Sequence, residues 1–126
     1  MAYSIQTGKI ETAKKVVIYG PEGIGKSTLA SKFPRPVFID CEGSTNELDV
    51  SRYPAPLTWG EILAFADDAV ENHTCDTLII DTADWCEQLC TKYTCDTLNV
   101  KNIEDIGYGK GYQYLTQNFT ELLKRC

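Results

Sequence analysis

Three short apolar runs stand out in a chain whose other segments mix apolar and polar positions. They cover residues 15–19, 37–40 and 77–81. A short run without alternating polar positions is typical of a strand that is buried on both faces of a sheet. We therefore predict three buried β-strands at these positions.

Apolar positions recur with helical spacing in most of the remaining chain. The first helix is expected to begin near Gly25 and to stop before Pro34, because proline and its predecessor disfavour helix. Thr58 and Glu61 fit a capping box, in which each side chain bonds the other residue's backbone N–H. The predicted helices cover residues 25–33, 59–71, 83–98 and 112–124, and the predicted loops cover residues 41–56 and 99–111.

The alternation of strands with helices predicts the fold class. A strand–helix order of this kind favours a parallel sheet covered by helices on both faces, which is the α/β class. The length of 126 residues suits one domain, so we expect residues 1–126 to form a single unit.

Composition limits the expected cellular location and binding partners of the protein. The chain carries 12 Lys and Arg against 18 Asp and Glu, a net charge of -6, which argues against indiscriminate binding to nucleic acid or anionic membrane. No apolar stretch approaches the roughly 20 residues of a membrane span, and the N-terminus lacks the apolar core of a signal peptide. We expect a cytoplasmic protein with no membrane partner.

Six cysteines are many for this length, and two interpretations of them stay open. Cys86 and Cys90 are four positions apart and can share a helix face, with Cys95 and His73 nearby in the sequence, so a zinc site is one reading. No C-x-x-C pair occurs, however, and nothing marks the chain as secreted. Reduced, partly buried thiols are the reading that this pattern favours.

A glycine-rich segment follows the first apolar run and matches the pattern G-x-x-x-x-G-K-[ST] in full. In this pattern glycines let backbone N–H groups point inward around phosphates, and the following helix adds its positive end. Lys26 is expected to reach the β- and γ-phosphates of ATP, and the hydroxyl of Ser27 to hold Mg²⁺. We call residues 20–28 the phosphate loop; it comprises Gly20, Pro21, Glu22, Gly23, Ile24, Gly25, Lys26, Ser27 and Thr28.

Acidic residues end the second and third predicted strands. Asp81 closes the run of residues 77–81, at the sheet edge where α/β proteins bind ligands, and is expected to hold Mg²⁺ with Ser27. Glu42 follows the second strand and is a candidate to orient and polarise an attacking water beside the γ-phosphate. The alternative for Glu42 is a loop carboxylate that points into solvent.

Together these segments resemble the RecA-like ATPases. The stretch GPEGIGKST is similar to the phosphate loop of the bacterial recombinase, FIDCEG to the segment with the catalytic glutamate, and LIIDT to the metal-side strand. The wider pattern, with GYGKGY, resembles phage-encoded RecA-like ATP-binding proteins, a group that includes single-strand-annealing recombinases. The resemblance covers residues 15–125. It implies Mg²⁺-dependent ATP hydrolysis, catalytic roles for Lys26 and Glu42, a homo-oligomer, and action on single-stranded DNA.

The resemblance also implies a further strand between the first and third strands, reached after the last helix, whereas this sequence stops at Cys126 on a helix. We therefore expect an incomplete RecA-like core with weak hydrolysis by these 126 residues alone. We expect the gap to close by collapse of the two strands, by dimerisation, or by insertion of residues 4–10. Each of these would move Asp81 away from Ser27.

Residues 99–111 lie where RecA-like proteins carry a DNA-contacting loop. Tyr108 is a candidate to stack on a base and Lys110 to meet a phosphate. A glycine-rich linker with one tyrosine packed on the next helix is an equally weighted reading of the same residues.

Two other functions compete with a RecA-like ATPase. A P-loop nucleotide or small-molecule kinase would pair residues 15–19 directly with residues 77–80, although Arg35, Arg52 and Arg125 form no lid-like cluster. A nucleotide-gated interaction module would bind ATP without hydrolysing it, which Glu42 argues against. The strand that neighbours residues 15–19 is the feature that separates the kinase from the RecA-like reading.

Overall fold

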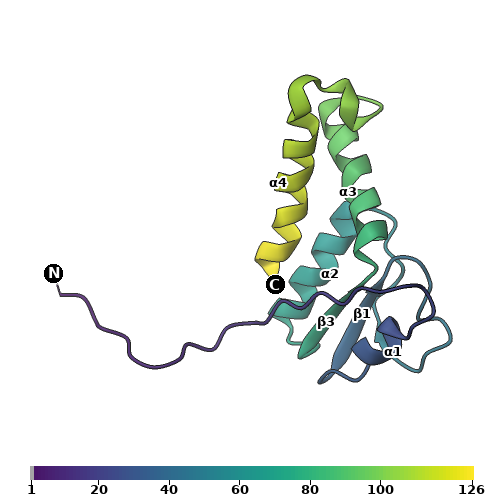
Figure 1. Ribbon diagram of the computed structural model, residues 1–126. Coiled ribbons are helices and arrows are strands. Elements are labelled where there is room, and N and C mark those ends of the chain that lie inside the picture. Colours follow the sequence, from purple (N-terminus) through teal and green to yellow (C-terminus); the bar gives the residue numbers. More distant parts are fainter. Residues whose placement is uncertain (1) are drawn as a thin grey trace.

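A computed structural model describes residues 2–126, except for the side chain of Tyr108. Figure 1 shows a small sheet, a group of longer helices beside it and an extended N-terminal segment. In chain order the elements are α1 (Lys26–Ala30), β1 (Pro36–Asp40), β2 (Ser51–Arg52), α2 (Trp59–Glu71), β3 (Thr77–Asp81), α3 (Ala83–Leu98), the 3-10 turns η1 (Ile103–Asp105) and η2 (Gly107–Gly109), and α4 (Lys110–Arg125).

The sheet is parallel, with β1 in the centre between β2 and β3. β1 and β3 pair along their whole length, from Pro36 opposite Thr77 to Asp40 opposite Asp81, so their carboxyl ends lie level. Phe38 and Ile39 are both fully buried although successive strand residues point to opposite faces, so both faces of β1 are covered. The predicted α/β class with a parallel sheet is confirmed.

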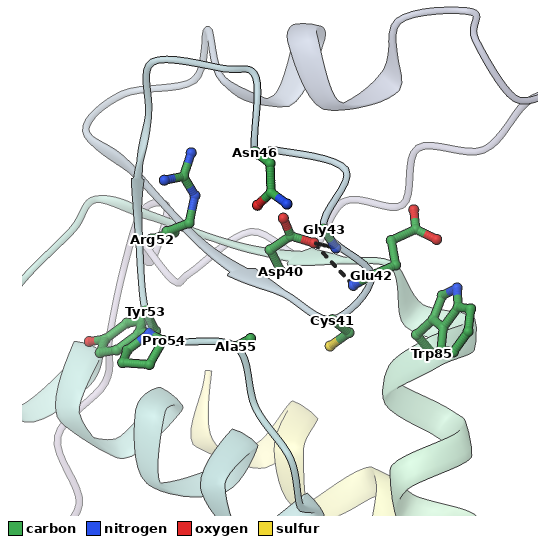
Figure 2. Close-up of a pocket in the computed structure, with 10 residues that line it drawn as sticks. All are labelled: Asp40, Cys41, Glu42, Gly43, Asn46, Arg52, Tyr53, Pro54, Ala55 and Trp85. Carbon is green, nitrogen blue, oxygen red and sulfur yellow. Dashed lines mark hydrogen bonds between the residues drawn. The ribbon is translucent and has the colours of Figure 1, made fainter.

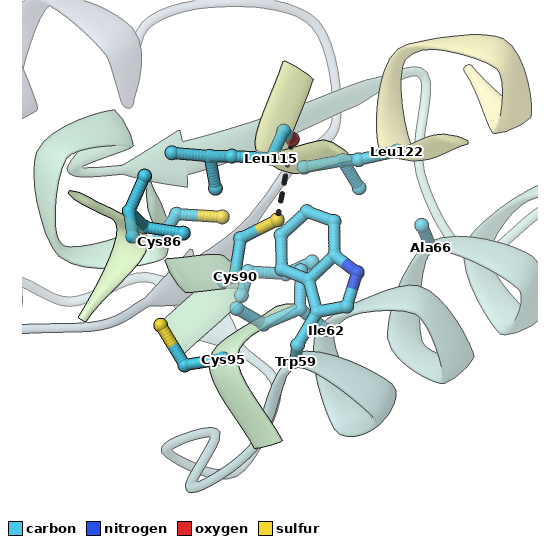
Figure 3. Close-up of a cluster of buried hydrophobic side chains, with 10 residues drawn as sticks. Trp59, Ile62, Ala66, Cys86, Cys90, Cys95, Leu115 and Leu122 are labelled. Carbon is cyan, nitrogen blue, oxygen red and sulfur yellow. Dashed lines mark hydrogen bonds between the residues drawn. The ribbon is translucent and has the colours of Figure 1, made fainter. Parts of the chain in front are cut away.

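The core lies among α2, α3 and α4 and reaches the sheet at Ile39. Figure 3 shows Trp59 of α2 within this cluster, together with cysteines of α3 and leucines of α4. The Trp59 ring stacks on Phe119 with a centroid separation of 5.7 Å. An aromatic pair of this kind contributes about 0.5–1.5 kcal/mol beyond its buried area. The thiol of Cys90 adds a weak bond to the Leu115 carbonyl at 3.9 Å, which ties α3 to α4.

Two local features fix where helices begin. The hydroxyl of Thr58 accepts the backbone N–H of Glu61 at 3.1 Å at the start of α2, which is one of the two bonds of the predicted capping box. Gly111, in the first turn of α4, packs so closely on η1 that a Cβ there would lie 2.3 Å from the carbonyl oxygen of Ile103. Only glycine fits this contact without a shift of the backbone.

The predicted strand at residues 15–19 is wrong. These residues are not in the sheet, and Val17 and Tyr19 are 85% and 90% exposed. An apolar run becomes a strand only beside a strand with a free edge, because its backbone groups need partners. Both edges of β1 are taken, and within residues 2–126 no strand pairs with the outer edge of β3. The intervening strand that the RecA-like arrangement requires is therefore missing from the sheet.

The expected closure of the gap within one chain is also wrong. Residues 15–19 do not collapse onto β3, and residues 4–10 stay exposed outside the sheet. Figure 1 shows this N-terminal segment running away from the sheet. Insertion would order several residues at about 1–2 kcal/mol each before any strand bond compensates. Dimerisation stays a prediction.

Two predicted loops contain short regular elements. β2 lies within residues 41–56, and η1 and η2 lie within residues 99–111. The predicted helices at residues 59–71 and 83–98 are confirmed, while α4 begins two residues earlier than expected and α1 ends at Ala30. Across residues 2–126, none of the helices has the length and apolarity needed to cross a membrane.

Candidate functional site

The carboxyl ends of β1 and β3 form one edge where the site residues gather. Asp40 and Asp81 are register partners, and the backbone N–H of Cys41 donates to the Asp81 carbonyl at 2.7 Å. This edge is where open α/β sheets bind ligands, because the loops that follow parallel strands splay apart there.

The phosphate loop reaches this edge although the residues before it are not in the sheet. Gly23 and Gly25 have φ of 80° and 100°, a region that side-chain-bearing residues rarely adopt. A Cβ on either would meet nothing within 4 Å, so conformation rather than crowding requires glycine. α1 follows directly, with the Leu29 N–H bonded to the Gly25 carbonyl at 2.9 Å.

Lys26 folds back over the loop. Its Nζ donates to the carbonyl of Gly20 at 2.7 Å and to that of Pro21 at 3.1 Å. Among the described residues it forms no ion pair with a carboxylate. Its positive charge is thus fixed at the mouth of the loop by neutral partners and is available to an anion.

Ser27 and Asp81 meet across the site. The Ser27 hydroxyl donates to Oδ2 of Asp81 at 2.5 Å, and Asp81 is only 7% exposed. A hydroxyl and a carboxylate are hard oxygen ligands of the kind that Mg²⁺ prefers, with water and phosphate oxygens completing its shell. The donor set therefore fits this ion. In this single chain, where the gap beside β3 stays open, Asp81 is not moved away from Ser27, and α1 is held at the tip of β3 without the strand before it. Displacement of Asp81 on dimerisation stays a prediction.

Asp40 holds the loop after β1 together. Its carboxylate accepts the backbone N–H groups of Glu42, Gly43 and Thr45 at 2.8–3.1 Å, and also the Thr45 hydroxyl. Burial favours the neutral acid, but these bonds, that of the Thr45 hydroxyl first, outweigh it and lower the pKa of Asp40. Arg52 completes the network through Thr45, from Nε to Oγ1 at 3.0 Å and from Nη2 to the carbonyl at 2.7 Å. Asp40 is thus a structural carboxylate.

Glu42 lies next to this network with its side chain exposed. The carboxylate forms no hydrogen bond or ion pair to any described residue, and it touches neither Ser27 nor Asp81. Figure 2 shows it lining a pocket of about 640 Å³ on the side of Trp85, away from the carboxylate of Asp40. The structure thus places Glu42 at the predicted edge but not against the phosphate loop.

The structural role of Asp40 and the exposed ring of Trp85 were not predicted from the sequence. An aspartate followed by glycine at i+3 and threonine at i+5 does carry a signal, since Asp side chains commonly bond the backbone of the next few residues. No local sequence signal indicates that the Trp85 side chain is exposed, because its position in the helix does not by itself tell which face of that helix packs against the core.

The remaining candidates lie away from this edge. Lys110 is exposed at the start of α4, and the side chain of Tyr108 lies outside the described residues. All six cysteines are free thiols, with Cys86, Cys90 and Cys95 buried. Within residues 2–126, no group of three or more His, Cys, Asp or Glu side chains is arranged to hold a metal ion.

Comparison with known proteins assigns the family. Residues 12–126 match the family described as an AAA domain. The chain is 23% identical over 118 residues to the SPbeta prophage-derived uncharacterized protein YorG of Bacillus subtilis (strain 168), which covers 88% of this chain and 36% of that protein. The chain thus spans little more than a third of that relative, and no solved structure matches it. Because the family match covers nearly the whole chain, the chain belongs to the AAA domain family of P-loop NTPases.

Proposed function

We propose that this domain binds ATP with Mg²⁺ through the phosphate loop. The observation that carries the proposal is the bond between Ser27 and Asp81, which brings together two hard oxygen groups, of the kind that Mg²⁺ prefers, from positions 54 apart in the sequence. Lys26 stands on the same loop with a charge that no described carboxylate neutralises. In this arrangement Lys26 binds the β- and γ-phosphates, and Ser27 and Asp81 hold Mg²⁺, which neutralises phosphate charge when bound.

We further propose that the protein containing this domain hydrolyses ATP, with Glu42 as the residue that orients the water. Glu42 follows β1, whose end lies level with Asp81, and its carboxylate is free to accept a proton. Because the Glu42 carboxylate forms no hydrogen bond to the phosphate loop or to Asp81 here, the role requires the loop of residues 41–46 to bring it to the γ-phosphate. We expect slow hydrolysis by residues 1–126 alone.

A RecA-like ATPase that acts on single-stranded DNA as a homo-oligomer in the cytoplasm is the finer proposal. It is supported by the order of the three motifs, by the pairing of β1 with β3, and by a free outer edge of β3 among the described strands. Similarity to a prophage-derived protein fits a phage origin. Lys110, exposed at the start of α4, and Tyr108 are the proposed DNA contacts.

The kinase alternative required residues 15–19 to pair with β3, and they do not.

A module that binds ATP without hydrolysing it is distinguished from an ATPase by experiment. The test measures ATP binding by calorimetry for this domain and ATPase activity for a longer protein that contains it, with and without single-stranded DNA. Binding and DNA-stimulated hydrolysis support the proposal. Binding without hydrolysis supports the interaction module, and no binding at millimolar ATP contradicts nucleotide binding itself.

A further inference from the structure

We propose that the pocket between the loop after β1 and the first turn of α3 is a binding site for a guanidinium group, such as the end of an arginine side chain. The pocket, of about 640 Å³, is lined by residues 40–43 and 52–55 together with Asn46 and Trp85. Figure 2 shows Glu42 and Trp85 on one side of it and Pro54 and Ala55 below. Its volume lies in the range of small-ligand sites.

The charge of the pocket favours a cation. Asp40 is anionic but its oxygens are occupied by four donors, so the carboxylate of Glu42 is the acidic group left to bind a ligand. Arg52 lines the pocket as well, yet its guanidinium is bound to the carbonyls of Thr45 and Leu48 at 2.7 and 2.9 Å. With the carboxylates of Asp40 and Glu42 and the single guanidinium of Arg52, the pocket lining carries a net negative charge. This charge disfavours the binding of phosphates and nucleic acid.

The aromatic wall favours a flat cation. Trp85 is 47% exposed, whereas Trp59 is 2% exposed and already stacked on Phe119. Tyr53 is stacked on Phe65 with centroids 4.9 Å apart, so one face of its ring is in use. Trp85 therefore offers the free indole surface of the pocket, and indole is the best aromatic partner for a cation.

A guanidinium matches both walls at once. Its planar fork donates two parallel bonds to a carboxylate, and its face stacks on an aromatic ring, which the tetrahedral ammonium of lysine does not match. Glu42 thus has a second role as an anchor. Because its carboxylate cannot pair with a guanidinium and orient a water together, occupation of the pocket should slow any hydrolysis that uses Glu42.

The experiment uses this domain without nucleotide, so its result does not depend on the proposed ATP site. Trp fluorescence is titrated with N-acetylarginine amide, with the matching lysine derivative and with urea as controls for charge and for denaturation. We expect a saturable change with arginine in the millimolar range and at least fivefold weaker binding in Glu42→Gln. Trp85→Phe lacks the reporter at the pocket, so the absence of a response there shows only that the signal comes from Trp85. Glu47→Gln, on an exposed acid outside the pocket, is the matched control and should bind normally.

Circular dichroism and the remaining Trp59 emission confirm that each variant is folded. A peptide with one arginine is titrated in parallel: binding more than tenfold tighter than the amide assigns the site to a protein partner, and equal binding assigns it to a free small molecule. The proposal is overturned by the absence of a saturable response to arginine, by an equal response to lysine, or by unchanged affinity in folded Glu42→Gln.

Discussion

The Ser27 hydroxyl donates a hydrogen bond of 2.5 Å to the carboxylate of Asp81, and this contact joins the phosphate loop to the tip of β3. It forms although residues 15–19, which precede the loop, are outside the sheet. The phosphate loop is therefore placed by its contact with Asp81 and not by a strand of its own. The contact also occupies the pair of oxygens that would hold Mg²⁺, so metal binding requires the hydroxyl proton to turn away from Asp81.

Replacement of Lys26 by alanine should abolish measurable ATP binding. The change removes the charge at the mouth of the loop, and a hydrogen bond from a charged group contributes about 1.5–3 kcal/mol, so the loss of two such contacts to phosphate corresponds to about a hundredfold or more. Calorimetry measures the affinity. Lys32→Ala, on an exposed lysine shortly after α1, is the matched control and should bind like the wild type. Normal affinity in Lys26→Ala would remove this residue from the site.

Replacement of Glu42 by glutamine should spare ATP binding and slow hydrolysis. An amide keeps the shape of the side chain but cannot accept a proton, and a general base typically contributes about a hundredfold or more. The measurement is steady-state turnover in a longer protein that contains this domain. Unchanged kcat would exclude Glu42 as the base.

Asp40→Asn should destabilise the fold by about 2–3 kcal/mol. In the wild type, backbone N–H groups donate to the Asp40 carboxylate, and the NH₂ of the new asparagine would face one of these donors as a second donor. The pKa of Asp40 is lowered in the folded state, since the bonds it accepts outweigh its burial. Its contribution is therefore complete above its unfolded pKa of about 3.9 and is lost as the pH falls through the lower folded value. Urea unfolding from pH 7 to pH 3 measures this loss.

In Asp40→Asn the decrease in unfolding free energy below about pH 4 should be smaller than in the wild type. Asp49→Asn, at an exposed position of the same loop, should leave both the stability and its pH dependence unchanged. Equal pH dependence in Asp40→Asn and the wild type would show that another carboxylate dominates.

Gly111→Ala should lower the free energy of unfolding by about 1–3 kcal/mol. The new Cβ would lie 2.3 Å from the Ile103 carbonyl oxygen, and overpacking of this kind exceeds the gain of about 1 kcal/mol from replacing glycine in a helix. Thermal unfolding measures the change. Gly107→Ala, where a Cβ meets nothing within 4 Å, is the control. Equal melting temperatures would show that η1 and α4 separate at no cost.

Features that depend on neighbouring residues could be predicted from the sequence. Features that depend on a partner far along the chain could not. The phosphate loop, β1, β3 and α2 carry their signals locally, in glycines, apolar runs and the cap at Thr58. Residues 15–19 carry the same signal as β1, yet they form no strand: the strand expected to lie between them and β3 is missing from the sheet, and they do not pair with the free outer edge of β3 themselves. The bond between Ser27 and Asp81 was expected only for a complete sheet, and the free Trp85 became visible only in three dimensions.

The most direct test of the account is the Mg²⁺ dependence of ATP affinity in the wild type and in Ser27→Ala and Asp81→Asn, measured by calorimetry with and without EDTA. We predict that Mg²⁺ tightens ATP binding at least tenfold in the wild type and less than threefold in either variant, while affinity in EDTA is similar in all three. Melting temperatures within a few degrees of the wild type show that the variants are folded. Wild-type affinity that does not depend on Mg²⁺, or full Mg²⁺ dependence in both folded variants, would contradict the assignment of Ser27 and Asp81 as the metal-binding pair.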